Sequence, residues 1–436
     1  MNFLQNFTIL KKHPSIRKYF ANTSWLLGER ILRMGVSLFV GIYVARFLGP
    51  EKFGLLSYTV SFVWLFSSLA SFGLNNILVR ELVQSPEQRN NLLGTVFWLK
   101  VFGTFVMATA ITAVLQFFEE DQQTYWMIVL IALGWLFQTT NVIELCFQAQ
   151  VQSKFIVRAQ VVQLLITSLF KIYLIWIQAE LIWFAFALML DQAVVAVLFL
   201  IMYRWKIDWF PFFFFNWKRA KKLMGGAWPL IFSGMMVLLY MKIDQVMLKE
   251  MLNTKAVGEY AAAVKLCEAW YFIPSAIMAS LFPAIIEARK KSEEIYEKRV
   301  QKLYELMVWG SLLVALPITF LADWVIQVLY GANFQEAAII LKIYIWTFVF
   351  VSLGVASSHW LVAENLEKYV LFRSSLGAIL NISLNWYLIP IYGITGAAYS
   401  TLITQLFVAY IFFVFSKDTR HSFVLSTRAL SFRLIK

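Results

Sequence analysis

Long apolar runs separated by short polar connections make up most of this chain. About twelve such runs follow one another, near residues 22–46, 53–77, 92–117, 125–148, 155–177, 180–203, 224–247, 257–286, 303–329, 337–362, 368–389 and 393–415. A helix of about 20 apolar residues crosses the roughly 30 Å hydrocarbon core of a bilayer. Spanning strands would be shorter and would alternate in polarity. The pattern therefore predicts an all-α polytopic membrane protein with about 12 transmembrane helices.

Composition agrees with this prediction. The chain of 436 residues is 60% hydrophobic and only 14% charged, whereas roughly 25% of the residues of an average soluble domain are charged. The formal net charge of +13 comes from basic residues in the short connections, so it indicates topology and no nucleic-acid partner is expected. Cys146 and Cys267 both lie inside apolar runs, where they are expected to be core residues without a disulfide.

Lysine and arginine residues are concentrated in every second connection between the apolar runs, and the connections in between contain few of them. One set includes the basic clusters at 204–222 and 289–302, the N-terminal Lys11 and Lys12, and the end of the chain at Lys436, whereas the other set offers only Arg46, Lys52, Lys249 and Lys255. Basic loops remain on the cytoplasmic side of a membrane. We therefore expect both termini in the cytoplasm. The first run has no small-residue cleavage site and is expected to be a retained helix.

The connection at 204–222 divides the runs into two groups of six. We expect an N-terminal six-helix lobe at 1–203, a cytoplasmic interfacial linker at 204–222 whose cations contact anionic lipid headgroups, a C-terminal six-helix lobe at 223–416 and a cytoplasmic tail at 417–436. The turn at 48–54 has an echo at 252–258, with Leu and Gly six residues apart in both. This echo indicates a parallel repeat with a substrate site between the lobes, near the midplane.

The sequence has none of the usual marks of an enzyme. It contains no phosphate-binding glycine loop, no Cys or His cluster with metal-ligand spacing and no G-x-S-x-G elbow, and its three histidines are scattered. Every predicted outward loop is short. We therefore expect a transporter without a catalytic site, a metal or a cofactor.

Charged residues inside the apolar runs are the candidate functional residues, because each costs about 2.5–3.5 kcal/mol at the bilayer centre and must face protein, water or a ligand. The cations are candidate substrate contacts: Arg30, Arg33, Lys171, Lys242 and Lys265. The carboxylates are candidate ion-coupling or charge-balancing groups: Glu29, Asp191, Asp244 and Glu268. An interior with several cations suits an anionic ligand such as a phosphate or diphosphate.

Each candidate also has a structural interpretation. Glu29 with Arg33 and Lys265 with Glu268 share helix faces and can form ion pairs, and Arg30 can extend to the interface. Lys242 and Asp244 are two residues apart, so each needs a partner elsewhere or a substrate. Core hydrogen bonds are favoured for Glu144 and His359, and an interfacial position for Asp323. Lys171 has no carboxylate on its own helix.

Several motifs resemble those of one transporter family. They are Ala45-Arg46-Phe47-Leu48-Gly49-Pro50-Glu51-Lys52-Phe53-Gly54, Lys242-Ile243-Asp244 with Gly258-Glu259-Tyr260, Pro274 and Phe282-Pro283, Leu329-Tyr330-Gly331 with Phe334, and Tyr392-Gly393-Ile394-Thr395-Gly396-Ala397-Ala398. In order and placement they resemble the Wzx-type polysaccharide flippases of the MOP superfamily, which also contains MATE drug exporters and lipid II flippases. The similarity covers essentially the whole chain.

The resemblance implies a MATE-like fold of two six-helix lobes that alternate access. It implies a flippase of the bacterial cytoplasmic membrane for undecaprenyl-diphosphate-linked oligosaccharide, coupled to H⁺ or Na⁺, with membrane lipids and the polysaccharide polymerase machinery as further partners. The same architecture permits a cation-coupled multidrug antiporter, but that substrate would favour carboxylates over cations. A lipid II flippase typically carries two more helices. A membrane polymerase or ligase for the same glycans would need a larger outward loop.

Overall fold

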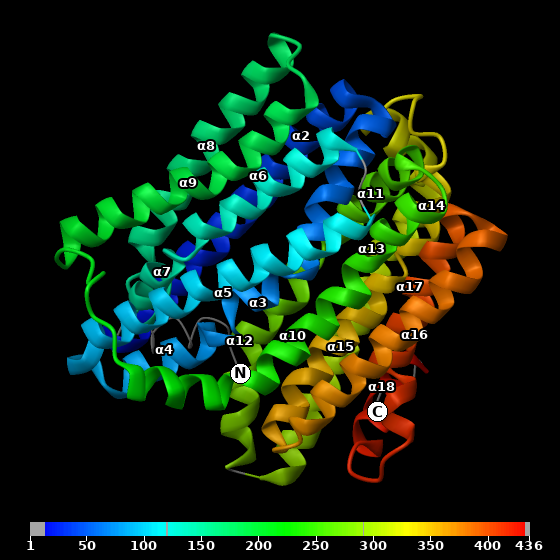
Figure 1. Ribbon diagram of the computed structural model, residues 1–436. Helices are drawn as coiled ribbons and strands as arrows, with labels where there is room; N and C mark the ends of the chain where they lie inside the picture. The colour runs from blue at the N-terminus through cyan, green and yellow to red at the C-terminus, as the bar shows by residue number, and fades with distance from the viewer. Residues whose placement is uncertain (1–13, 119–120, 291, 432–436) are drawn as a thin grey trace. The chain divides into compact units, whose positions relative to one another are not determined.

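The regular structure of this chain is helical. The computed structural model describes residues 14–118, 121–290 and 292–431, and all regular structure within these ranges is α-helix or short 3-10 helix (Figure 1). This confirms the predicted all-α class. The terminal residues Lys11, Lys12 and Lys436, which entered the orientation argument, lie outside the described residues.

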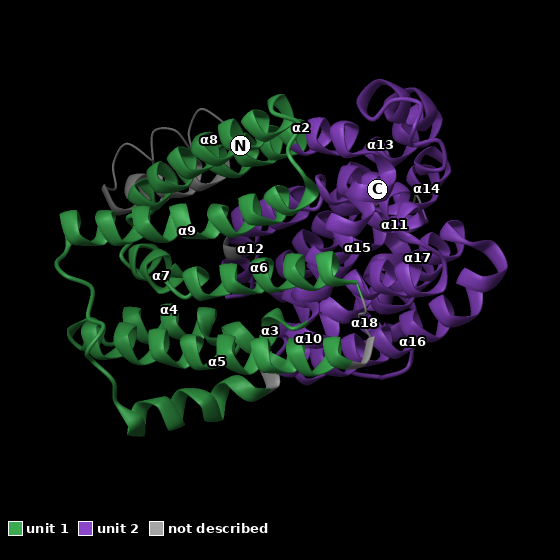
Figure 2. Cartoon of the chain, turned by 45° about the horizontal axis from the view of Figure 1, so that its top comes forward, with its two compact units in different colours: residues 1–40, 66–231 green, residues 41–65, 232–436 purple. Residues whose placement is uncertain are grey.

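The chain forms two compact units (Figure 2). One comprises residues 1–40 and 66–231, and the other comprises residues 41–65 and 232–436. The boundaries fall inside two long helices, α2 and α10. The helices of the first unit, with these two shared ones, are α2 (Pro14–Leu65), α3 (Ser67–Ser71), α4 (Leu74–Gln84), η1 (Pro86–Gln88), α5 (Arg89–Phe118), α6 (Gln122–Gln138), α7 (Asn141–Ala149), α8 (Ser153–Trp176), α9 (Leu181–Lys206) and α10 (Trp217–Met251).

The second unit continues from the later parts of α2 and α10. Its remaining helices are α11 (Thr254–Glu268), α12 (Phe272–Arg289), α13 (Glu293–Leu329), α14 (Ala337–Tyr344), α15 (Thr347–Ala363), α16 (Lys368–Tyr392), α17 (Ile394–Ala409), η2 (Ile411–Val414) and α18 (Arg420–Leu430). The predicted tail at 417–436 thus contains a helix. α18 packs on α13, and the hydroxyls of Tyr304 and Ser422 are 2.9 Å apart.

Ten helical segments among the described residues are long and apolar enough to cross a membrane. The predicted runs 22–46 and 53–77 account for one difference from the predicted twelve, because the first run and the beginning of the second lie on the single helix α2, which bends at Gly49 (φ 70°, ψ 172°). Glycine adopts this positive φ without the strain that a side chain would bring. α16 covers the predicted run 368–389, and its buried Asn381 and Asn385 make it less apolar than the ten.

Four predicted spans are interrupted where the sequence pattern indicated continuous helices. The breaks lie at Phe72–Gly73, where both residues have positive φ, at Thr139–Thr140, at 269–271 and at 345–346. They fall in the second and fourth spans of each six-span half, so the two halves share the same pattern of broken helices. An apolar pattern does not reveal such breaks, because the backbone groups at the breaks are satisfied locally: the hydroxyls of Thr139 and Thr140 donate to carbonyl oxygens of the preceding turn, for example.

The two echo turns pack directly against each other within the second unit. A Cβ atom built on Gly54 would lie 1.8 Å from the Thr254 carbonyl oxygen, and one on Gly258 would lie 1.9 Å from the Pro50 carbonyl oxygen. The Ser61 hydroxyl also donates to the side chain of Gln245 at 2.9 Å. Residues 41–65 are therefore held to α11 by backbone contact that only glycine permits, and to α10 by a side-chain hydrogen bond.

Candidate functional site

The first candidate cluster lies on α2. Arg33 Nε donates to Glu29 Oε1 at 2.5 Å, which joins the two predicted site residues as an i,i+4 ion pair. The Glu29 side chain is buried, while the Arg33 Nη2 atom is buried without a hydrogen-bond partner in the described structure. Arg30, which directly follows Glu29 in the helix, is exposed. The pair leaves donor capacity on Arg33 that a ligand can use.

A second ion pair joins α8 to α9, two neighbouring helices of the same unit (Figure 1). Lys171 Nζ lies 2.5 Å from Asp191 Oδ2, and Gln163 Nε2 donates to the other carboxylate oxygen at 2.8 Å. Asp191 thus holds Lys171 through a contact between helices. The sequence supplied both residues as candidates but not their pairing.

Lys100 on α5 is a buried cation that the sequence analysis missed. Its Nζ donates to the side-chain oxygens of Asn75 and Asn141, each at 2.6 Å, and its exposed fraction is 3%. Asn75 and Asn141 lie directly after the two helix breaks of the first unit, in α4 and α7. The sequence could have indicated Lys100 as a candidate, because a lysine inside the apolar run 92–117 is unusual. The two asparagines that it joins could not be paired with it from sequence.

In the second unit, Lys242 on α10 pairs with Glu268 on α11. Its Nζ lies 2.9 Å from Glu268 Oε1 and 3.2 Å from Oε2. Lys265, one turn before Glu268, lies 5.7 Å from the centroid of the Phe53 ring and close to Gly41 of α2. Two predicted cations and one predicted carboxylate therefore occupy the same part of this unit.

Asp244 has a different environment from Lys242, although the two residues are close in sequence. It is 1% exposed and accepts hydrogen bonds from the hydroxyls of Tyr260 and Thr401, at 2.6 and 2.5 Å, and from Asn385 Nδ2 at 2.6 Å. These partners are neutral. The Oδ1 atom of Asn385 is itself buried without a partner in the described structure. The cluster joins α10, α11, α16 and α17 around one carboxylate.

The other intramembrane groups of the sequence analysis have local partners. Glu144 Oε1 accepts from Gln160 Nε2 at 3.3 Å, and the His359 ring nitrogen Nδ1 lies 3.0 Å from the Val355 carbonyl oxygen. Asp323 is largely exposed and pairs with Lys342 at 2.6 Å. The hydrogen bond of Glu144 agrees with its structural interpretation. His359 is exposed, so the core position expected for it is wrong. Cys146 and Cys267 are buried and free.

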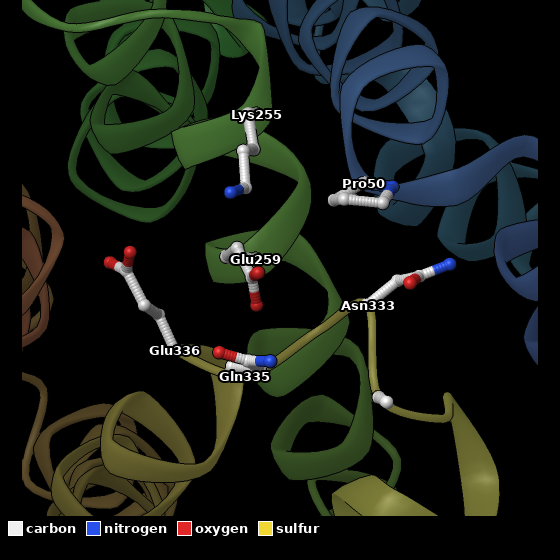
Figure 3. Close-up of a pocket in the computed structure, with 7 residues that line it drawn as sticks. Pro50, Lys255, Glu259, Asn333, Gln335 and Glu336 are labelled. Carbon is white, nitrogen blue, oxygen red and sulfur yellow. The ribbon is translucent and has the colours of Figure 1, made fainter.

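A pocket of about 320 Å³ opens beside the echo turns of the second unit. Figure 3 shows its lining, which is mostly polar and is formed by Pro50, Lys255, Glu259, Ala332, Asn333, Gln335 and Glu336. The buried Glu259 accepts from the Ala337 backbone N–H at 2.9 Å and so holds the N-terminus of α14. None of the predicted site residues lines this pocket.

Comparison with known proteins gives the family. The family model described as "Polysaccharide biosynthesis protein" matches residues 19–289, more than half of the chain. The chain belongs to the polysaccharide biosynthesis protein family. This agrees with the resemblance that the motifs indicate. Glu29, Arg33, Lys100, Asp191, Lys242, Asp244 and Lys265 all lie inside the matched region of this family member.

Two relatives of this family member are archaeal. A Haloferax volcanii protein named "Probable low-salt glycan biosynthesis flippase Agl15" is 22% identical over 193 residues, which are 43% of this chain and 40% of the relative. The match thus spans less than half of that relative. "Uncharacterized membrane protein MJ1068" of Methanocaldococcus jannaschii is 22% identical over 448 residues, with 93% of this chain and 86% of the relative covered.

Solved structures give the same fold. An inward-facing multidrug resistance MATE family transporter of the MOP superfamily matches with a TM-score of 0.73 at 14% identity, covering 93% of this chain and 99% of that one. The lipid II flippase MurJ matches with a TM-score of 0.53 at 14% identity, covering 94% and 91%. The family member therefore has a MATE-like fold.

Proposed function

We propose that this chain is a flippase that moves undecaprenyl-diphosphate-linked oligosaccharide repeat units across the bacterial cytoplasmic membrane by alternating access. The family match over residues 19–289, on a MATE-like fold, carries the proposal. A relative named as a probable glycan biosynthesis flippase supports it. Both termini are cytoplasmic in this proposal, and polysaccharide polymerase machinery is the expected partner. We assign transport to the chain and no covalent step.

Cations in the interior are assigned to the diphosphate of the substrate. Arg33 is the best placed of them, because Glu29 engages its Nε and the buried Nη2 is left without a partner. A guanidinium presents a planar fork of donors that matches a phosphate. Arg30 lies beside it and extends the same cationic surface. Arg30 and Arg33 together thus form an entry site for an anionic headgroup.

The remaining cations each sit next to a group that the substrate can replace. Lys171 and Lys242 are held by the carboxylates of Asp191 and Glu268, and Lys265 lies one helical turn from Glu268. A diphosphate oxygen can take the place of the carboxylate oxygen as acceptor, because both are anionic. Glu29, Asp191 and Glu268 then act as charge-balancing groups that keep the interior stable when no substrate is bound.

The assignment of these cations to the substrate can be tested by comparing single variants at matched membrane abundance. Arg33→Ala, Lys242→Ala and Lys265→Ala should each lower surface-polysaccharide export by at least about tenfold, because each removes a charge-assisted contact. Arg46→Ala is the control, since Arg46 is exposed and makes one long 3.5 Å contact with the Val328 carbonyl oxygen. Full export by all three variants would show that the electrostatic site is wrongly assigned. Altered drug sensitivity with unchanged export would instead indicate a drug antiporter.

Asp244 is assigned to the coupling cation, H⁺ or Na⁺. A buried carboxylate with only neutral donors around it gains stability from a proton or a cation. The unpartnered oxygens of Asn385 and Thr404 add neutral ligands of the kind that Na⁺ accepts. Both residues lie on the helices, α16 and α17, that supply partners to Asp244.

The coupling test uses full-length protein in proteoliposomes with a fluorescent lipid-linked glycan. Either an imposed proton gradient or an imposed sodium gradient should accelerate flipping by the wild-type protein, depending on which cation Asp244 binds. Asp244→Asn should abolish that acceleration and leave the gradient-independent rate. Asp323→Asn, which alters an exposed carboxylate paired with Lys342, should retain it. Gradient-driven flipping by Asp244→Asn at the wild-type rate would disprove the assignment.

A further inference from the structure

The connection between α9 and α10 carries an exposed surface that the proposed transport does not use. The linker surface consists of the exposed aromatic side chains and the exposed cations on and beside residues 204–222: Trp205, Trp209, Phe213, Phe214, Phe215, Trp217, Lys154, Arg204, Lys206, Lys218, Lys221 and Lys222. Phe213 is 100% exposed and Trp209 74%. Exposed rings this numerous need a partner, because water solvates them poorly.

The backbone beneath this surface is firmly held. Trp98 Nε1 donates to the Phe212 carbonyl oxygen at 2.7 Å, and the Asn216 backbone N–H donates to the Thr95 hydroxyl at 3.1 Å. The inner ring of Phe210 is buried and packs against those of Phe97, Phe212 and Tyr203. The outer rings are therefore presented by an ordered scaffold.

Arg204 and Lys206 of the linker surface lie against aromatic rings. Arg204 lies 4.7 Å from the Trp209 ring, and Lys206 lies 3.8 Å from the Trp205 ring. The only carboxylate in residues 204–222 is Asp208, which accepts from the Trp209 backbone N–H at 2.7 Å. Positive charge is thus left available for an outside anion.

The other basic connection on the same predicted side provides a contrast. In residues 289–302 of the second unit, Arg289 pairs with Glu364 at 2.9 Å and Lys298 with Glu294 at 2.6 Å. Glu297 lies 2.7 Å from His421. Carboxylates therefore lie beside the basic residues of this segment. The two connections are both basic, but only the linker surface joins unpaired cations to exposed aromatic rings.

We propose that the linker surface binds anionic phospholipid headgroups of the cytoplasmic leaflet. Aromatic rings are favoured at the depth of the lipid headgroups, and lysine and arginine near that depth attract anionic lipids. This surface supplies both at once on an ordered backbone. The binding requires the cytoplasmic orientation that the lysine and arginine distribution predicts. It does not require that the transported substrate is a glycan.

The test measures lipid binding to the full-length protein by native mass spectrometry, with phosphatidylglycerol and phosphatidylcholine as probes. The linker variant combines Lys218→Gln, Lys221→Gln and Lys222→Gln. The control combines Lys290→Gln, Lys298→Gln and Lys302→Gln, which are also exposed and remove the same charge. The linker variant should lose phosphatidylglycerol affinity by at least about tenfold, whereas the control should lose less than about twofold.

Several outcomes would overturn the proposal. They are equal losses in the two variants, no loss in the linker variant, or wild-type binding of phosphatidylcholine as tight as that of phosphatidylglycerol. Raising the salt concentration should weaken phosphatidylglycerol binding to the wild type and change the linker variant little, because exposed charges are screened. Melting temperatures in lipid-free detergent should be the same for both variants, since all six lysines are exposed. Neither readout depends on transport.

Discussion

The contact between the echo turns predicts that alanine at Gly258 destabilises the second unit. Gly258 lies within α11, and a Cβ atom there would meet the Pro50 carbonyl oxygen at 1.9 Å and the Pro50 carbonyl carbon at 2.7 Å. Ordinary contacts begin near 3.4 Å. Because the neighbour is backbone, no side-chain rotation relieves the clash. The turn at 48–54 would have to move away from α11.

The magnitude follows from two opposing terms. Forcing an extra carbon into a packed interior costs typically about 1–3 kcal/mol, and a backbone clash this close belongs at the upper end. Replacing glycine by alanine inside a helix offsets at most about 1 kcal/mol. The net loss is therefore about 2 kcal/mol. For a unit of 150–250 residues this corresponds to a fall in melting temperature of about 4–8 °C.

Thermal unfolding in detergent, followed by a thiol-reactive dye or by monodispersity after heating, measures this shift. Gly310→Ala is the matched control, because Gly310 also lies in a helix, α13, and has no atom within 4 Å of its built Cβ. It should leave the melting temperature unchanged or raise it slightly. Gly54→Ala should match Gly258→Ala, and the double variant should lose less than the sum, because both act on one contact. A Gly258→Ala protein with the same melting temperature as the Gly310→Ala control would refute the reasoning.

Three further predictions concern contacts inside the first unit. Lys171→Ala and Asp191→Ala should each reduce folded protein in the membrane, and the double variant should recover part of the loss, because each single change leaves an unpaired charge; additive losses measured by membrane abundance would contradict the pairing. Lys100→Met should raise protease sensitivity near the helix breaks, because it leaves the partly buried amide oxygens of Asn75 and Asn141 without this donor. An unchanged digestion pattern would argue against this role. Trp98→Phe should increase hydrogen exchange at 210–216, and exchange at the wild-type rate would show that the bond to Phe212 does not order the linker.

Much of the architecture was readable from the chain because lipid imposes a simple rule. A helix must present about 20 apolar residues to cross the bilayer, so runs such as 92–117 and 180–203 mark spans wherever they occur. Burial of charge imposes a second rule, which selected Arg33, Lys171 and Asp244 as candidates before any contact was known. The echo between the turns at 48–54 and 252–258 was visible as well, since the two turns share their leucine and glycine spacing.

The partners of the charged residues were not readable in this way. Lys171 pairs with Asp191 and Lys242 with Glu268 across neighbouring helices, which depends on how each helix is rotated about its axis. The prediction could state that Lys242 and Asp244 need separate partners, but not that the partners of Asp244 are neutral. Lys100 was overlooked because its significance comes from Asn75 and Asn141, which meet it only in the folded unit.

The sequence by itself determined the class of molecule, the approximate number of spans and the residues too polar to face lipid, because hydrophobic length and charge are properties of the chain alone. Only the tertiary structure decided where four spans break, which charges pair and that the two echo turns meet at Gly54 and Gly258. Those features depend on approaches of a few ångströms between segments far apart in the chain, and the apolar pattern of a single helix does not encode them.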